Sequence, residues 1–201
     1  MTSALAINCT LKPSPAPSSS EVIARQVLDA LSVQGVDGTM VRAVDHDIRP
    51  GVERDMGDGD QWPQIFDRVR NTDILLLATP TWLGHMSSVA QRVLERLDAE
   101  ISATDDQGRP GMLGKVAMCA VVGNEDGAHK IIADVFGALN DIGFTVPGQG
   151  STYWNDEAMG GRDYKDLDTI PSAVADATNA AARNAAHLAE LLTRSEFPAY
   201  S

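Results

Sequence analysis

Short apolar runs alternate along this chain with longer stretches in which apolar residues recur at helical spacing. The clearest run is residues 73–78, which is apolar almost throughout, as expected of a strand that is covered on both faces. Residues 115–122 repeat the pattern. The remaining predicted strands are residues 4–8, residues 39–44, and a short last strand that starts at 144–146. Arg42 interrupts the strand at 39–44, which indicates a position near the edge of a sheet.

Helices are predicted between these strands. Residues 20–33 place apolar side chains at helical spacing, and Gly35 follows as a stop signal. Further helices are expected at residues 62–71, 87–101, 127–142 and, rich in alanine, 171–194. Residues 45–60 read as a long polar loop, which usually marks a functional or mobile segment. Residues 147–170 contain tyrosine and tryptophan but little periodicity, and we expect an irregular segment there.

The order of these elements predicts an α/β fold. Strand and helix alternate about five times over residues 1–201, with no sign of a domain boundary. This alternation favours a single doubly wound domain with a five-stranded parallel sheet of order 2-1-3-4-5. Ligands bind such sheets beyond the carboxyl ends of the strands. The loops after Asn8, Ala78 and Val122 are therefore the places to look for a site.

Charge and composition exclude several classes of function. The chain has 16 basic and 28 acidic residues, a net charge of −12, so a nucleic-acid or anionic-membrane partner is not expected. No apolar run approaches the ~20 residues of a membrane span, and the first residues lack the basic start of a signal peptide. Cys9 and Cys119 are the only cysteines and stand far apart in the sequence, which favours reduced thiols in the cytoplasm and no metal centre.

The first loop, residues 8–20, is dense in hydroxyl side chains and carries Lys12. It feeds three serines into the start of a helix, where free N–H groups and the helix dipole favour a phosphate. It has neither the P-loop pattern nor the glycine pattern of a dinucleotide fold. A serine cap on a proline-rich loop explains the same residues equally well.

The second loop, residues 79–88, places Pro80 and Gly84 on either side of Trp82. An exposed aromatic at the carboxyl edge of the sheet is a platform for a flat ring, and a core tryptophan is the alternative. We expect His85 on the surface.

The third loop, residues 123–129, contains Gly123 and Gly127, which let backbone approach a ligand closely. Glu125 and Asp126 are adjacent and point apart, so they do not read as an acid–base pair; favourable charge at a helix start explains them as well.

Together, in this order, the three loops resemble those of the flavodoxin-like superfamily, in particular its NAD(P)H-dependent FMN reductase and multimeric-flavodoxin branch. Thr10-x-Lys12 followed by Ser18-Ser19-Ser20 is similar to the family's phosphate loop, although this loop is longer and richer in proline. The segment from Thr79 to Ser87 is similar to the family's Thr-Pro-x-Tyr-x-Gly-x-x-Ser motif, with Trp82 in place of tyrosine. The resemblance covers residues 4–150, and the cysteine cluster of iron–sulfur flavoproteins is absent.

The resemblance implies an FMN-dependent NAD(P)H oxidoreductase that passes hydride through bound FMN to a small-molecule acceptor. The implied phosphate ligands are Thr10, Lys12, Ser18, Ser19 and Ser20. The implied ring contacts are Pro80, Thr81, Trp82, Leu83 and Gly84. The implied pyrimidine contacts are Gly123, Asn124 and Gly127, with Glu125 and Asp126 between them. No acid–base residue and no metal is required, and family members form homodimers or homotetramers.

The sequence is also compatible with other functions. A flavodoxin-like electron carrier without its own NAD(P)H oxidation uses the same fold, and a quinone or azo reductase uses the same chemistry. A phospho-acceptor receiver domain needs an aspartate at the end of the third strand, where this chain has Thr79 and Pro80. The aromatic residues Tyr153 and Trp154 either cover the ring or pack a subunit interface.

Overall fold

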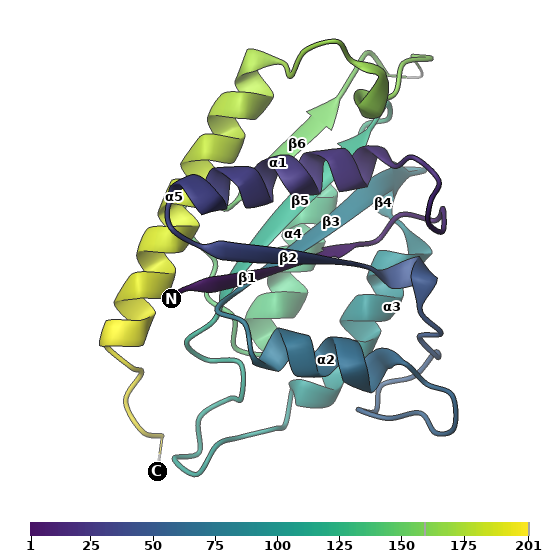
Figure 1. Ribbon diagram of the computed structural model, residues 1–201. Helices are drawn as coiled ribbons and strands as arrows, with labels where there is room; N and C mark the ends of the chain where they lie inside the picture. Colours follow the sequence, from purple (N-terminus) through teal and green to yellow (C-terminus); the bar gives the residue numbers. More distant parts are fainter. Residues whose placement is uncertain (159, 201) are drawn as a thin grey trace.

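Five parallel strands form the centre of the protein, in the order β2-β1-β3-β5-β6 (Figure 1). The computed structural model describes residues 1–158 and 160–200. The strands are β1 (Ser3–Asn8), β2 (Asp37–Arg42), β3 (Ile74–Trp82), β5 (Val116–Gly123) and β6 (Ser151–Asn155), with the two-residue β4 (His85–Met86) antiparallel to β3. Counted without β4, this is the predicted order 2-1-3-4-5. The strand that carries Arg42 lies at an edge of the sheet, as its polar interruption indicates.

Helices cover both faces of this sheet. They are α1 (Ser19–Val33), α2 (Trp62–Arg70), α3 (Ser88–Leu97), α4 (Ala128–Asp141) and α5 (Ser172–Arg194), with single turns η1 (Ala43–Asp45), η2 (Asp98–Glu100) and η3 (Tyr164–Asp166). Leu5 and Ile7 of β1 pack on the side of α2, α3 and α4, whereas Ala4 and Ala6 pack on the side of α1 and α5. Because alternate side chains enter two different cores, the central strands are apolar at every position.

The last strand differs from its prediction. Residues 144–146 were expected to start it, but Thr145 makes only an isolated bridge to Val116, and β6 begins at Ser151. Phe144 follows the end of α4, and its side chain is buried in the core, which accounts for the apolar residue that suggested a strand. In β6, Thr152 and Trp154 are buried while Tyr153 is exposed, the alternation of a strand with one solvated face. Part of the segment predicted to be irregular is therefore an edge strand.

The central strand β3 is longer than predicted. It runs past Ala78 to Trp82 and folds back into β4, with Thr81 opposite Met86 and Trp82 opposite His85. The two turn residues, Leu83 and Gly84, have φ values of 52° and 73°. Positive φ at both positions is typical of a tight type I′ hairpin turn. The second loop is thus a β-hairpin that projects from the carboxyl edge of the sheet.

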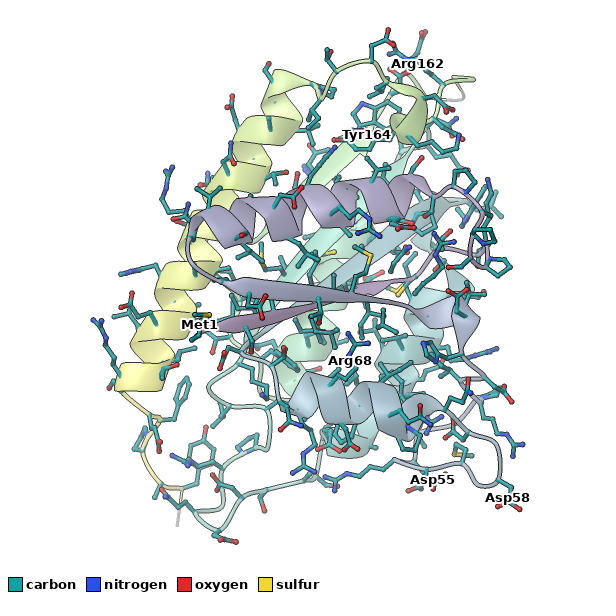
Figure 2. The ribbon with its side chains drawn as sticks, viewed as in Figure 1. Met1, Asp55, Asp58, Arg68, Arg162 and Tyr164 are labelled. Carbon is teal, nitrogen blue, oxygen red and sulfur yellow. The ribbon has the colours of Figure 1, made fainter. Side chains whose placement is uncertain are left out.

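The long polar loop before α2 is fastened by a buried ion pair. The side chains of Arg96 and Asp60 are both 0% exposed, and the Arg96 Nη2 lies 2.7 Å from the Asp60 Oδ2. The Arg96 guanidinium also donates to the carbonyls of Arg49, Glu53 and Arg54. Only the outer turn of the loop, which carries the labelled Asp55 and Asp58, reaches far from the body (Figure 2).

Candidate functional site

The loops after β1, β3 and β5 lie at the carboxyl edge of the sheet (Figure 1). Residues of all three loops line a cavity there. This cavity encloses about 650 Å³, including the solvent above it. Most of the predicted site residues line it: Thr10, Lys12, Ser18, Ser19, Ser20, Pro80, Thr81, Trp82, Gly123 and Asn124. The predicted residues Leu83, Gly84, Glu125, Asp126 and Gly127 are outside this lining.

The hydroxyl end of the cavity is formed by the first loop and the start of α1. Ser18 caps the helix by accepting a hydrogen bond from the N–H of Glu21 at 3.2 Å. The Ser18 and Ser20 hydroxyls lie 3.0 Å apart, and both side chains are buried. Thr10 accepts from the N–H of Lys12 at 3.3 Å. The serine cap and the cavity lining involve the same residues, so the two interpretations of this loop are compatible.

Two residues outside the first loop hold it in place. Arg42, at the end of β2, donates to the carbonyls of Lys12 and Ala16 at 3.1 and 2.9 Å and pairs with Glu21. Asp45 accepts from the N–H and hydroxyl of Ser14 at 2.7 and 2.6 Å. The Ser14 hydroxyl and N–H bonds lower the pKa of Asp45. These contacts span 21 to 31 residues, so local sequence patterns gave no signal for them.

The β-hairpin places Trp82 at the mouth of the cavity. Its side chain is 51% exposed and lines the cavity, so it is not a core tryptophan. Leu83 is 88% exposed at the tip, and His85 is a surface residue whose Nδ1 lies 2.8 Å from the Leu83 carbonyl. An aromatic side chain half open to solvent offers one face to a flat ligand.

Ser87 links the first and second loops beneath the cavity. Its hydroxyl donates to the Cys9 carbonyl at 2.6 Å and accepts from the N–H of Ala90, which caps α3. Its own N–H donates to the Thr79 hydroxyl at 3.1 Å. Ser87 is 1% exposed, so this single hydroxyl fixes the spacing of two loops from a buried position.

Glycines allow the second and third loops to pack closely. A Cβ on Gly127, where φ is 131°, would lie 2.7 Å from the Gly84 carbonyl oxygen. A Cβ on Gly123 would lie 3.0 Å from that of Thr81. At Gly84 itself, added bulk meets only Asp126 at 3.7 Å, so the positive φ is what requires glycine there. Glycine at positions 84 and 127 therefore lets the β-hairpin and the third loop pack directly against each other.

A segment late in the chain completes the cavity, and no motif or periodicity predicts this role for it. We call residues 160–167 the strap. Asp163, Tyr164 and Lys165 of the strap line the cavity, as do Leu11, Pro17, Val122 and Trp154. Tyr164 is buried against Trp154, with ring centroids 5.3 Å apart, and its hydroxyl donates to Gln26 of α1 at 2.6 Å. Tyr153 points away from the cavity toward His129.

The electrostatics of the cavity suit binding rather than acid–base chemistry. Burial, followed by the charge of Cys119, raises the pKa of the Cys9 thiol well above its usual range, so it is no nucleophile. Burial also raises the pKa of Tyr164. Within residues 1–158 and 160–200, no cluster of histidine, cysteine and carboxylate side chains has the arrangement of a metal site. The lining offers hydroxyls, backbone N–H groups, two lysines, the aromatic rings of Trp82, Trp154 and Tyr164, and the carboxylate of Asp163.

The sequence of this chain matches the model of a known protein family over most of its length. The sequence model of the NADPH-dependent FMN reductases matches residues 2–158. The chain is 32% identical over 170 residues to the 8-demethyl-8-aminoriboflavin-5'-phosphate synthase of Streptomyces davaonensis, covering 80% of this chain and 66% of that protein. A crystal structure of RosB with bound 8-demethyl-8-formylriboflavin-5'-phosphate superposes with a TM-score of 0.88 at 28% identity, covering 98% of this chain and 82% of that one.

A further match is to part of a larger protein. The chain is 39% identical over 167 residues to the divalent metal cation transporter MntH of Mycobacterium bovis, covering 81% of this chain. It spans about a quarter of that transporter's length and about two thirds of the synthase's. In the part of the chain that the structure describes, no helix has the length and apolar character needed to cross a membrane.

Proposed function

This chain belongs to the NADPH-dependent FMN reductase family, and from that premise we propose that it is an FMN-dependent NAD(P)H oxidoreductase with a small-molecule electron acceptor. The observation that carries the proposal is the cavity itself, which joins a hydroxyl-rich helix start to a half-exposed tryptophan. These are the two recognition elements that a flat ring with a phosphate tail requires. The sheet order is that of the flavodoxin-like fold.

The residues present fit FMN at both ends. Thr10, Ser18 and Ser20 have buried side chains that nevertheless line the cavity, next to the first N–H groups of α1. Their hydroxyls reorient at little cost, so they can donate to phosphate oxygens. Lys12 lies at the same end, and within the described residues no carboxylate lies within ion-pair distance of it. An exposed lysine is then available to the phosphate.

FMN, when bound, supplies the hydride chemistry, and the protein orients it and excludes competing contacts. In this proposal, Thr10, Lys12 and Ser18–Ser20 hold the phosphate. Thr81 and Trp82 lie along the ring with Pro80, and Gly123 and Asn124 close the other side. Leu83, Gly84, Glu125, Asp126 and Gly127 stay proposed as site residues at the rim, where they shape the hairpin and the third loop. No side chain of the lining acts as an obligatory acid or base.

The large exposed face of Trp82 leaves room for a second flat molecule, so NAD(P)H and the acceptor would use the same place in turn. We also propose a homodimer or homotetramer in the cytoplasm. The exposed apolar tip, Trp82 and Leu83, supports contact with a second copy, and the two buried thiols support a reducing compartment. Sedimentation of the flavin-loaded protein tests the oligomeric state.

A second candidate function follows from the relatives. The RosB structure, with its TM-score of 0.88, holds a flavin phosphate as a reaction intermediate. A flavin 5'-phosphate would then be the substrate of this chain, and it would leave chemically altered. The mass of the flavin recovered after turnover separates the candidates: an unchanged FMN supports the oxidoreductase, and a modified ring supports the second function.

The binding experiment is a titration of the flavin-free protein with FMN and with riboflavin, followed by flavin fluorescence. We expect saturable FMN binding and riboflavin binding at least tenfold weaker, because a charge-assisted phosphate contact contributes roughly 1.5–3 kcal/mol. Equal affinity for the two flavins would show that the first loop does not bind the phosphate. The same titration of Lys12→Ala should lower FMN affinity about tenfold and leave riboflavin unchanged.

A further inference from the structure

The hydroxyl end of the cavity contains a second lysine, which the strap contributes from outside the matched segment. Lys165 lines the cavity together with Lys12 and Ser19. It follows the end of the family match at residue 158, so nothing in that match assigns it a role. The first loop brings one cation to this end of the cavity, whereas a phosphate monoester carries about −1.5 to −2 charge near neutral pH. A second cation at this end would offset more of that charge than Lys12 can alone.

The strap is anchored, so Lys165 has a defined position. Its backbone N–H donates to the Ser19 hydroxyl at 3.3 Å, which joins the strap to the first turn of α1. The neighbouring Tyr164 is 3% exposed and bonded to Gln26 of the same helix. Figure 2 shows the labelled Tyr164 between the strap and α1, while Arg162 points outward from the outer edge of the strap. Asn124 of the third loop holds the strap from the other side by donating to the Gly160 carbonyl at 2.5 Å.

The ammonium of Lys165 has carboxylate partners that can leave it. Its Nζ lies 2.8 Å from Asp163 and 2.6 Å from Asp166. The lysine side chain is 20% exposed, but those of Asp163 and Asp166 are 49% and 61% exposed. Because exposed ion pairs contribute little stability, these carboxylates can turn to solvent at small cost, whereas the confined lysine stays at the cavity. An incoming phosphate would therefore exchange with them.

We propose that Lys165 is a second phosphate-binding residue, which releases Asp163 and Asp166 when the 5'-phosphate of a flavin nucleotide occupies the hydroxyl end of the cavity. This inference rests on the proposed function, since it assigns a ligand group to the same cavity. It adds a specificity element, because a flavin without phosphate leaves the three-residue ion-pair cluster intact and gains nothing from Lys165.

Three variants test the exchange, with FMN and riboflavin affinities measured on each. Lys165→Met keeps the aliphatic stem and should weaken FMN at least tenfold while riboflavin changes less than twofold. Asp166→Asn removes a competing carboxylate that does not line the cavity, and it should strengthen FMN binding two- to fivefold. Lys165→Arg should retain most of the affinity. Lys130→Ala is the matched control, because it also breaks an exposed lysine–aspartate pair, with Asp134, outside this cavity.

The results distinguish a failure of the proposed flavin binding from a failure of the proposed role of Lys165. If wild-type protein binds neither flavin, the proposed function fails. If wild-type protein prefers FMN but Lys165→Met binds it equally well, only the role of Lys165 is overturned. A purely structural ion pair would make Asp166→Asn weaken both flavins instead of strengthening FMN, and this sign distinguishes the cases even if Lys165→Met folds poorly.

Discussion

Arg42 should control FMN affinity without touching the cofactor. Its guanidinium is only 9% exposed and bridges two carbonyls of the first loop, at Lys12 and Ala16, while it also pairs with Glu21. Hydrogen bonds from a charged donor contribute about 1.5–3 kcal/mol each. Losing both carbonyl contacts in Arg42→Met should cost about 3–6 kcal/mol of loop ordering, part of it on FMN binding, since methionine retains the packing of the stem. If the loop is ordered only when FMN binds, each 1.4 kcal/mol of this ordering cost lowers the affinity for FMN tenfold.

The assay is isothermal titration of Arg42→Met with FMN and riboflavin, alongside urea unfolding of the flavin-free protein. We expect FMN to bind 10- to 100-fold more weakly, with a smaller effect on riboflavin, which lacks the phosphate. Arg68→Ala is the control, because Arg68 donates to Thr39 on the same edge strand but lies far from the loop (Figure 2). Unchanged FMN affinity in Arg42→Met would show that Arg42 does not order the first loop for phosphate binding. An equal loss of affinity for both flavins would show a general disturbance of the cavity instead.

Three more predictions concern the supports of the cavity and the long loop. Gly127→Ala should lose about 1–3 kcal/mol of unfolding free energy, because its Cβ would meet Gly84 backbone at 2.7 Å, and an unchanged melting temperature would contradict this. Ser87→Ala should cost about 1–3 kcal/mol and weaken FMN, because the buried Cys9 carbonyl loses its donor, while the exposed neighbour Ser88→Ala should change neither quantity. Burial opposes ionisation of Asp60, but bonds from Arg96 and from the N–H groups of Met56, Trp62 and Arg49 outweigh it and hold its pKa well below the usual range. Because the folded pKa is depressed, the Asp60 carboxylate stabilises the protein above its unfolded pKa of about 3.9, and this stabilisation falls as the pH drops below that value. Asp60→Asn should lower the free energy of unfolding by about 3–5 kcal/mol at neutral pH. In urea unfolding at several pH values, the unfolding free energy of Asp60→Asn should fall less steeply toward acid pH than that of the wild type.

The sheet was predictable because its central strands obey a local rule. Leu75 and Leu77 enter one core and Leu76 the other, so burial on both faces appears directly as an unbroken apolar run. The strand β6 was not predicted, because it lies at the edge of the sheet and has no continuous apolar run: Tyr153 is exposed and Trp154 is buried. The end of β3 was not predicted either. The sequence indicates a loop there, whereas Leu83 and Gly84 adopt positive φ values and form a hairpin turn.

The site was predictable as far as it follows the ends of β1, β3 and β5. Parallel strands bring their carboxyl ends to one edge, so Thr10, Thr81 and Gly123 meet for topological reasons. Tyr164 and Lys165 could not be found this way, because their partners Gln26 and Ser19 are 138 and 146 residues away. Contacts of that range depend on how the strap crosses α1, and no periodicity in the sequence encodes that crossing.

An FMN-dependent NAD(P)H oxidoreductase must hold FMN and let NAD(P)H reduce it. The direct measurement is the absorbance of the FMN-loaded protein under anaerobic conditions as NADPH, and separately NADH, is added in small portions. We expect the oxidised-flavin band to disappear after one equivalent of at least one nucleotide and to return on adding a quinone or air. The flavin recovered afterwards should be FMN of unchanged mass. A bound flavin that neither nucleotide bleaches, or one recovered with an altered ring, would contradict the proposed function.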